Sequence, residues 1–218
     1  VKSRLVQLLE ILKSNGSIAL ISDAGLPVIS DPGEELVHAS RLNNHEVICI
    51  PGPCAAITAL VASGLPSHRF CFEGFLPKKK SIRKKLLKYI SQEERTTIIY
   101  ESPHQLIKLL EELSTLCGKD RPIQIARELT KRYEESIGST IKEAIEYFQS
   151  NKPKGEFTII LGGKNENKKL ISESEAINKL KFLINEGQKS NDAARIIAEE
   201  TGYSKKWLYS KLHSKIDK

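Results

Sequence analysis

Short apolar runs alternate with amphipathic stretches along most of the chain. The runs are rich in Val, Ile, Phe and Thr, as expected for strands buried in a sheet. Between them, apolar side chains recur at helical spacing, first at Leu5, Leu8, Leu9 and Leu12. The pattern predicts an α/β fold with a sheet in each of two domains. We expect strands at 18–21, 46–50, 70–75, 96–100, 123–127 and 156–161.

The first predicted strand is followed by a loop, residues 22–33, that is rich in Gly, Pro and Asp. Open α/β sheets bind ligands where such loops leave the carboxyl ends of strands. Asp23 and Asp31 can accept hydrogen bonds from an amine or a ribose hydroxyl, and Gly25 allows a ligand to approach the backbone closely. Asp31 and Pro32 also suit the first positions of a helix. A tight turn is the alternative interpretation.

A second loop of the same kind follows the second predicted strand. It contains Gly52 and Pro53, and the small residues Ala55 and Ala56 come directly after it. Two successive strand–loop–helix units form a parallel sheet whose loops share one edge, which favours a pocket there. Close packing of a helix on a sheet also requires small residues, so it remains the alternative explanation.

The composition changes twice along the chain. Gly64 to Ser67 is a plausible junction between domains, and a polar linker follows Gly163. We therefore expect a first α/β domain at 1–66, a second at 67–165 and a helical domain at 172–218.

The helical domain has the small residues, glycine turn and apolar spacing of a helix-turn-helix. Ser172 and Glu175 predict a capping box, Asn191 and Ser204 predict two further caps, and Gly202 separates the last two helices. Lys205 and Lys206 lie on the last of these helices. Because that helix is basic, docking on nucleic acid is favoured over a plain helical hairpin for packing or dimerisation.

Positive charge favours an anionic partner. The net charge is +7, and one run contains seven cations and no acid. A solvated helix face usually alternates in sign, so this run predicts phosphate contacts, with a merely solvated helix as the alternative. Its members are Lys78, Lys79, Lys80, Arg83, Lys84, Lys85 and Lys88. Lys131 and Arg132 could extend the RNA path.

Several classes of protein are disfavoured. The sequence has no apolar run long enough to span a membrane and no visible signal peptide. Its four cysteines are scattered without a CxxC pair, and its five histidines lack ligand spacing. We therefore expect a cytoplasmic protein with no membrane association and no metal site.

Six segments occur in an order that resembles a known family: SDAGLPVISDPG, PGPCAAITAL, RFCFEGFLPKK, YESPHQL, ARELTKRYEE and KGEFTIIL. Together they resemble the bacterial small-subunit ribosomal RNA methyltransferase I family of the tetrapyrrole methylase superfamily. The resemblance implies two α/β domains that bind S-adenosylmethionine in the cleft between them. It further implies methylation of a cytidine ribose 2′-oxygen in small-subunit ribosomal RNA, free or in the assembled subunit, by a homodimer.

The resemblance also implies positions for the cofactor. The methionine and ribose parts would lie against the first loop and the adenosine near the second, with the strand ends close by. The implied cofactor-binding residues are Asp23, Gly25, Leu26, Gly52, Pro53, Ala55, Ala56, Tyr100, Arg127 and Gly155.

The chain departs from the family pattern in three ways. The family normally begins with a further strand and a glycine-bearing loop, whereas this chain begins inside the following helix, so we expect it to be truncated. Leu26 stands where Thr is usual, and Gln105 stands where Arg is usual.

Methyl transfer to a hydroxyl requires alignment of donor and acceptor and the removal of one proton. Glu101, Asp31 and Glu128 are candidate bases at strand ends, although Glu128 could equally pair with Arg127. Two other functions remain open: methylation of a tetrapyrrole precursor on the same fold, and non-enzymatic binding of nucleic acid through the tail. The basic run favours RNA over a tetrapyrrole, and the two loops favour an enzyme over a binding protein.

Overall fold

The computed structural model describes residues 2–164 and 172–213. The chain divides into two compact units, residues 1–164 and residues 165–218. None of the helices in the described ranges is both long and apolar enough to cross a membrane.

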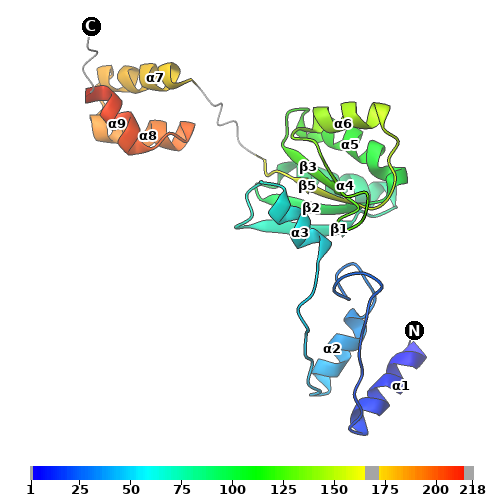
Figure 1. Ribbon diagram of the computed structural model, residues 1–218. Coiled ribbons are helices and arrows are strands. Elements are labelled where there is room, and N and C mark those ends of the chain that lie inside the picture. Colours follow the sequence, from blue (N-terminus) through cyan, green and yellow to red (C-terminus); the bar gives the residue numbers. More distant parts are fainter. Residues whose placement is uncertain (1, 165–171, 214–218) are drawn as a thin grey trace. The chain divides into compact units, whose positions relative to one another are not determined.

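A five-stranded mixed sheet forms the centre of the first unit (Figure 1). Strands β1, β2 and β3 run in one direction, and β5 is antiparallel to both β2 and β3. The carboxyl ends of β1, β2 and β3 therefore share one edge of the sheet. The strand order is β1 (Phe70–Phe75), β2 (Thr96–Glu101), β5 (Phe157–Leu161), β3 (Ile123–Arg127) and β4 (Glu135–Ile137).

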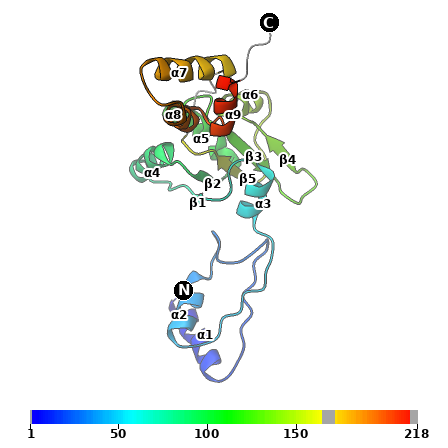
Figure 2. The same ribbon diagram turned by 90° about the vertical axis from the view of Figure 1, so that its left-hand side faces the viewer.

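Alternating residues of the strands build two hydrophobic clusters, one on each face of the sheet. On one face, Ile99, Ile125 and Ile159 pack beneath α4 (Lys80–Gln92), α5 (Pro103–Cys117) and α6 (Ile141–Ser150). On the other face, Ile98 and Ile160 pack against α3 (Ala55–Ala62). Burial of both faces explains why these strands are almost continuously apolar. The four strands expected from 70 onward are confirmed, whereas the short β4 (right of the sheet in Figure 2) was not predicted.

The two strands expected nearer the N-terminus are not formed. Residues 17–22 and 46–53 join no β-ladder in the described part of the chain, although helices α1 (Lys2–Lys13) and α2 (Glu34–Leu42) are present. Ile21 is 85% exposed, and Ile48 and Ile50 are also exposed. An apolar run becomes a strand only where its backbone finds a neighbouring strand, and the sequence pattern carries no information about that neighbour.

The predicted helix caps had mixed outcomes. The capping box predicted at Ser172 and Glu175 is present. Asp31 is not a cap, because α2 begins at Glu34 after Gly33. Asn191 is not a cap either, because it lies within α8 (Ser190–Thr201).

Three helices form the second unit around a core of their own. They are α7 (Glu173–Asn185), α8 (Ser190–Thr201) and α9 (Lys205–His213). Leu180, Ala194, Ile197 and Leu208 are buried among them. Gly202 ends α8 in the left-handed conformation, and Ser204 accepts a hydrogen bond from the N–H of Trp207 at 3.1 Å, as predicted. Residues 202–204 thus form a tight turn between α8 and α9.

Arg83 departs from the basic run to which it belongs in sequence. It is only 7% exposed, so the expectation that it contacts phosphate is wrong. Its Nη1 donates to Glu101 Oε2 at 3.4 Å and its Nε to Glu112 Oε2 at 2.9 Å. Arg83 lies on the same face of α4 as the buried Leu87 and Ile90, which follow it at i+4 and i+7, so helical periodicity contained the signal for its burial. The lysines of the run remain exposed.

We expect Arg83→Ala to destabilise the fold by about 3–5 kcal/mol, because it leaves the buried carboxylate of Glu101 without its cation. Urea unfolding followed by circular dichroism measures the change. The matched control is the exposed neighbour in Lys84→Ala, which should stay within about 0.5 kcal/mol of the parent. Equal effects of the two substitutions would contradict a structural role for the buried pair.

Candidate functional site

The two glycine- and proline-bearing loops lie against each other. The backbone N–H of Leu26 donates to the carbonyl oxygen of Pro53 at 2.9 Å. Gly25 has a φ of 72°, and a Cβ there would lie 2.8 Å from the same carbonyl oxygen. Only glycine tolerates both the conformation and the contact. The structure therefore brings together the predicted loop residues that were separated by about thirty positions in the sequence.

The first loop contains backbone strain. Val28 has a φ of 77° and Ser30 a φ of 56°, both in the left-handed region. A β-branched residue rarely adopts this conformation, and such residues gather at ligand-binding loops. Asp23 is exposed and Asp31 is partly exposed, and no hydrogen bond or ion pair among the described residues uses either carboxylate. The loop thus presents two carboxylates that are available to a ligand.

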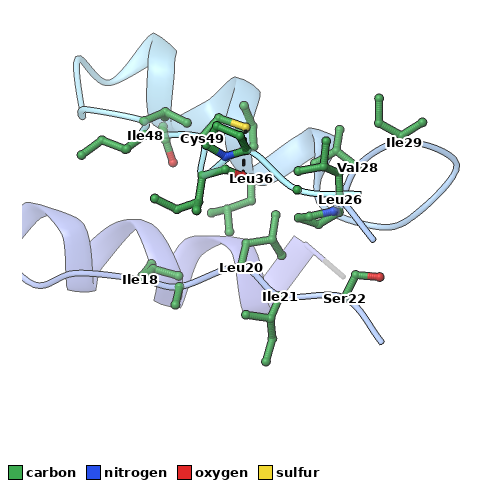
Figure 3. Close-up of a pocket in the computed structure, with 18 of the residues that line it drawn as sticks. Ile18, Leu20, Ile21, Ser22, Leu26, Val28, Ile29, Leu36, Ile48 and Cys49 are labelled. Atoms are coloured by element: carbon green, nitrogen blue, oxygen red, sulfur yellow. Dashed lines mark hydrogen bonds between the residues drawn. The ribbon is translucent and has the colours of Figure 1, made fainter. Parts of the chain in front are cut away.

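A pocket of about 840 Å³ opens between the first loop and the extended segments that flank it (Figure 3). Its wall is mainly apolar, with Ile18, Leu20, Ile48 and Leu36 among the lining residues. Gly25, Leu26 and Gly52 line it, whereas Asp23, Pro53, Ala55, Ala56 and Tyr100 do not. An apolar wall offers nothing to a cationic sulfonium. Three of the predicted cofactor residues therefore line this pocket, and the others lie outside it.

The start of α3 is tied to the edge of the sheet. The backbone N–H of Ala56 donates to the hydroxyl oxygen of Tyr100 at 3.0 Å. Burial raises the pKa of Tyr100, so its hydroxyl stays protonated at neutral pH. Ala55 is exposed and Ala56 is buried. Tyr100 also packs against Phe72 and Phe75, which sequence reasoning did not select.

Arg127 and Gly155 lie at the same edge, but the side chain of Arg127 is already engaged. Its Nε donates to the carbonyl oxygen of Lys154 at 2.7 Å, and its Nη1 bonds Glu135 at 2.9 Å. Glu135 also accepts a hydrogen bond from the hydroxyl of Tyr147. This bond and the one from Arg127 both lower the pKa of Glu135. No ion pair joins Arg127 to Glu128 among the described residues, and the charge of Arg127 contributes only to the lowered pKa of Glu128.

The three candidate bases differ in their surroundings. The carboxylate of Glu128 accepts hydrogen bonds from the N–H of Glu156 at 2.9 Å and from Lys131 at 3.2 Å, and these bonds lower its pKa. Glu101 is buried, pairs with Arg83 and accepts from the N–H of Ser102 at 2.9 Å. A lowered pKa or a buried ion pair weakens a carboxylate as a base. Asp31 is the candidate whose carboxylate has no such partner among the described residues.

The predicted RNA-contacting residues fall into separate groups. Lys78, Lys79, Lys80, Lys84 and Lys85 are exposed at the start of α4. Lys131 pairs with Glu128 and Glu156, and Arg132 lies over the ring of Tyr133 at 5.6 Å. Lys205 and Lys206 are exposed on α9 of the second unit. Within the described ranges, no three His, Cys, Asp or Glu side chains form a group that could hold a metal ion.

Two features require glycine at position 155: its backbone conformation and its close approach to the side chain of Glu128. It has a φ of 86°, and a Cβ there would lie 2.6 Å from the side chain of Glu128. Gly118 has the same φ of 86° with nothing within 4 Å, so it provides a matched control.

We expect Gly118→Ala to cost about 1–3 kcal/mol from its backbone conformation alone, because φ 86° with ψ 158° is adopted essentially by glycine. Gly155→Ala should cost at least about 1 kcal/mol more, because the carboxylate of Glu128 must also move. Urea unfolding of both variants measures the difference. Equal losses of unfolding free energy would show that the side chain of Glu128 moves aside at no cost and does not determine the structure of this sheet edge.

Comparison with known proteins identifies the family. A model of the tetrapyrrole (corrin/porphyrin) methylases matches residues 3–145. Ribosomal RNA small subunit methyltransferase I of Synechocystis sp. is 46% identical over 207 residues, covering 94% of this chain and 74% of that protein. The protein of the same name from Haemophilus influenzae is 48% identical over 206 residues, covering 93% and 72%.

Solved structures agree on the fold. The methyltransferase CobJ superimposes with a TM-score of 0.57 at 23% identity, over 73% of this chain and 70% of that one. Cobalt precorrin-4 methyltransferase gives a TM-score of 0.52 at 14% identity, over 74% and 70%. The fold is that of the tetrapyrrole methylases, and the chain belongs to the ribosomal RNA small subunit methyltransferase I family within them.

Proposed function

We propose that this protein transfers the methyl group of S-adenosylmethionine to the ribose 2′-oxygen of a cytidine in small-subunit ribosomal RNA. The observation that carries the proposal is the 46–48% identity, across more than nine-tenths of the chain, to proteins named ribosomal RNA small subunit methyltransferase I. The likeness to the methyltransferase CobJ and to cobalt precorrin-4 methyltransferase, at 14–23% identity, concerns the fold alone. RNA is therefore favoured over a tetrapyrrole as the substrate, and an enzyme over a passive binding protein.

The two joined loops are the proposed cofactor site. A sulfonium cation is attracted by carboxylates and carbonyl oxygens, and the first loop offers the exposed carboxylate of Asp23. When bound, the cofactor supplies an electrophilic methyl group for direct displacement. The hydrogen bond between Ala56 and Tyr100 fixes the start of α3, where the adenosine is expected to lie. The cofactor is further proposed to lie between two α/β domains that meet near residue 66.

Removal of the ribose hydroxyl proton is assigned to Asp31. Its carboxylate lies in the same strained loop as Asp23, and no interaction among the described residues occupies it. Glu101 and Glu128 are better suited to holding the sheet edge in place, because their oxygens already accept hydrogen bonds. Asp31 would thus act as the general base, with the displacement requiring no covalent intermediate.

The exposed lysines of α4 and the helical tail are each proposed to bind RNA. The turn at 202–204 and the exposed Lys205 and Lys206 on α9 support a helix-turn-helix-like role for the tail. The tail would add affinity without taking part in the chemistry. A homodimer and a cytoplasmic location are further proposals, and sedimentation velocity tests the first.

Tritium transfer from labelled S-adenosylmethionine to small ribosomal subunits tests the function directly. We expect label in a ribose, recovered as an alkali-resistant dinucleotide, because a methylated 2′-oxygen cannot assist strand cleavage. Naked ribosomal RNA in a parallel reaction distinguishes the two possible substrates. Label on a base, or transfer only to a porphyrinoid, would contradict the proposal.

We expect Asp23→Ala to weaken binding of S-adenosylhomocysteine by about 1–3 kcal/mol, because a polar group of the ligand loses its partner. Isothermal titration calorimetry measures the affinity. Asp120→Ala, an exposed carboxylate at the start of the loop before β3, is the control and should bind as the parent does. If Asp23→Ala also binds like the parent, the loop is only a turn.

The exposed lysines should govern the salt dependence of RNA binding. Each lysine that contacts a phosphate releases about one counterion, so Lys79, Lys84 and Lys85 changed together to Gln should flatten the log–log salt slope by about two to three. Filter binding at several salt concentrations measures the slope. Changing the exposed Lys108, Lys119 and Lys142 to Gln is the charge-matched control. Equal slopes in the two triple variants would exclude a phosphate path at α4.

A further inference from the structure

A bulge in β1 places two phenylalanine side chains on the same face of the sheet. Phe72 pairs with Ile98, but Gly74 pairs with Ile99 and Phe75 with Tyr100, so one residue, Glu73, is extra. In a regular strand, positions 72 and 75 would point to opposite faces, because they are three residues apart and side chains alternate along a strand. The bulge therefore turns Phe75 to the side of the sheet on which Phe72 and Tyr100 lie.

The three rings form an aromatic cluster at the carboxyl edge of the sheet. The ring of Phe72 lies 5.2 Å from that of Tyr100 in an edge-on arrangement, and the ring of Phe75 lies 5.6 Å from it. Tyr100 is partly buried and its hydroxyl is bound to Ala56. Phe75, by contrast, is 60% exposed. An aromatic ring that is held by neighbours on one side and open to solvent on the other can accept a stacked group.

The surroundings of Phe75 indicate what that group is. A Cβ on the preceding residue, Gly74, would lie 2.8 Å from Ser30 Oγ, so the strained first loop reaches this point of the strand. The exposed lysines begin three residues beyond Phe75, at Lys78. Phe75 therefore lies between the loop proposed for the cofactor and the lysines proposed for phosphate. A nucleotide of the RNA matches these surroundings, because it has a flat base that can stack on the ring and a phosphate that the lysines can bind.

We propose that Phe75 stacks on the base of the target cytidine and holds the nucleotide against the methyl donor. The inference rests on the proposed function. A ribose hydroxyl reaches an enzyme site most readily when its nucleotide leaves the helical stack, and the base then loses its stacking partners. The open face of Phe75 replaces one of them. Such stacking is tolerant of base identity, so Phe75 positions the nucleotide while other contacts select cytosine.

Phe75→Ala should lower kcat/KM for methyl transfer to small subunits by about 5-fold to 100-fold, the range for losing one base–aromatic stack. Phe75→Trp, which keeps an aromatic face, should restore activity to within a few-fold of the parent. Phe70→Ala is the matched control, because Phe70 is exposed at the other end of the same strand. Calorimetry with S-adenosylhomocysteine should give the parental affinity for all three variants.

Photocrosslinking to small-subunit RNA that carries 5-iodocytidine gives an independent measurement, since a stacked ring reacts with the excited base. We expect the linked peptide to contain Phe75 and the crosslink to be lost in Phe75→Ala, whereas a crosslink elsewhere in the chain would overturn the stacking inference. If the parent transfers methyl and Phe75→Ala does so equally well, the stacking inference fails while the proposed function stands. If the parent transfers none, the proposed function itself fails.

A third outcome would assign the ring to another role. If Phe75→Ala loses activity and also sediments as a smaller species than the parent, the ring belongs to a contact between subunits, and the stacking inference is overturned.

Discussion

One hydrogen bond, from the backbone N–H of Ala56 to the hydroxyl of Tyr100, sets the geometry of the whole candidate site. It fixes the start of α3 at the carboxyl end of β2. Because Pro53 lies just before α3 and its carbonyl accepts the N–H of Leu26, the same anchor holds both loops in place. Phe72 and Phe75 pack against the ring of Tyr100, which makes this bond. The burial of Ala56, Ala59 and Leu60 against the sheet adds to this anchor in holding α3 and the two loops at the sheet edge.

The fold could be predicted where the sequence pattern is local. Strands β2 and β5 could be predicted because they are buried on both faces, and their apolar runs are nearly continuous. The extended segment around Ile21 has the same composition but no ladder partner among the described residues, and pairing is a non-local property. The three residues of β4, Glu135 to Ile137, are too short and too polar to carry a pattern.

The candidate site could be predicted where glycine and proline mark it, as in the two loops. It could not be predicted where a side chain has two possible directions. Arg83 stands among cations in the sequence, yet its helical phase with Leu87 and Ile90 turns it inward to Glu101. Glu128 was a candidate base until its hydrogen bonds to Glu156 and Lys131 were known. The sequence shows which charge a side chain carries, but not which group that side chain contacts.

The bulge at Glu73 gives β1 one residue more than the stretch of β2 beside it. Because Phe72 still pairs with Ile98 and Gly74 with Ile99, the residues on either side of Glu73 keep the pairing and the faces that a regular strand would give them. A substitution or deletion at Glu73 should therefore change the local twist and bend of β1, because a bulge increases both, and leave the pairing of its two ends unchanged.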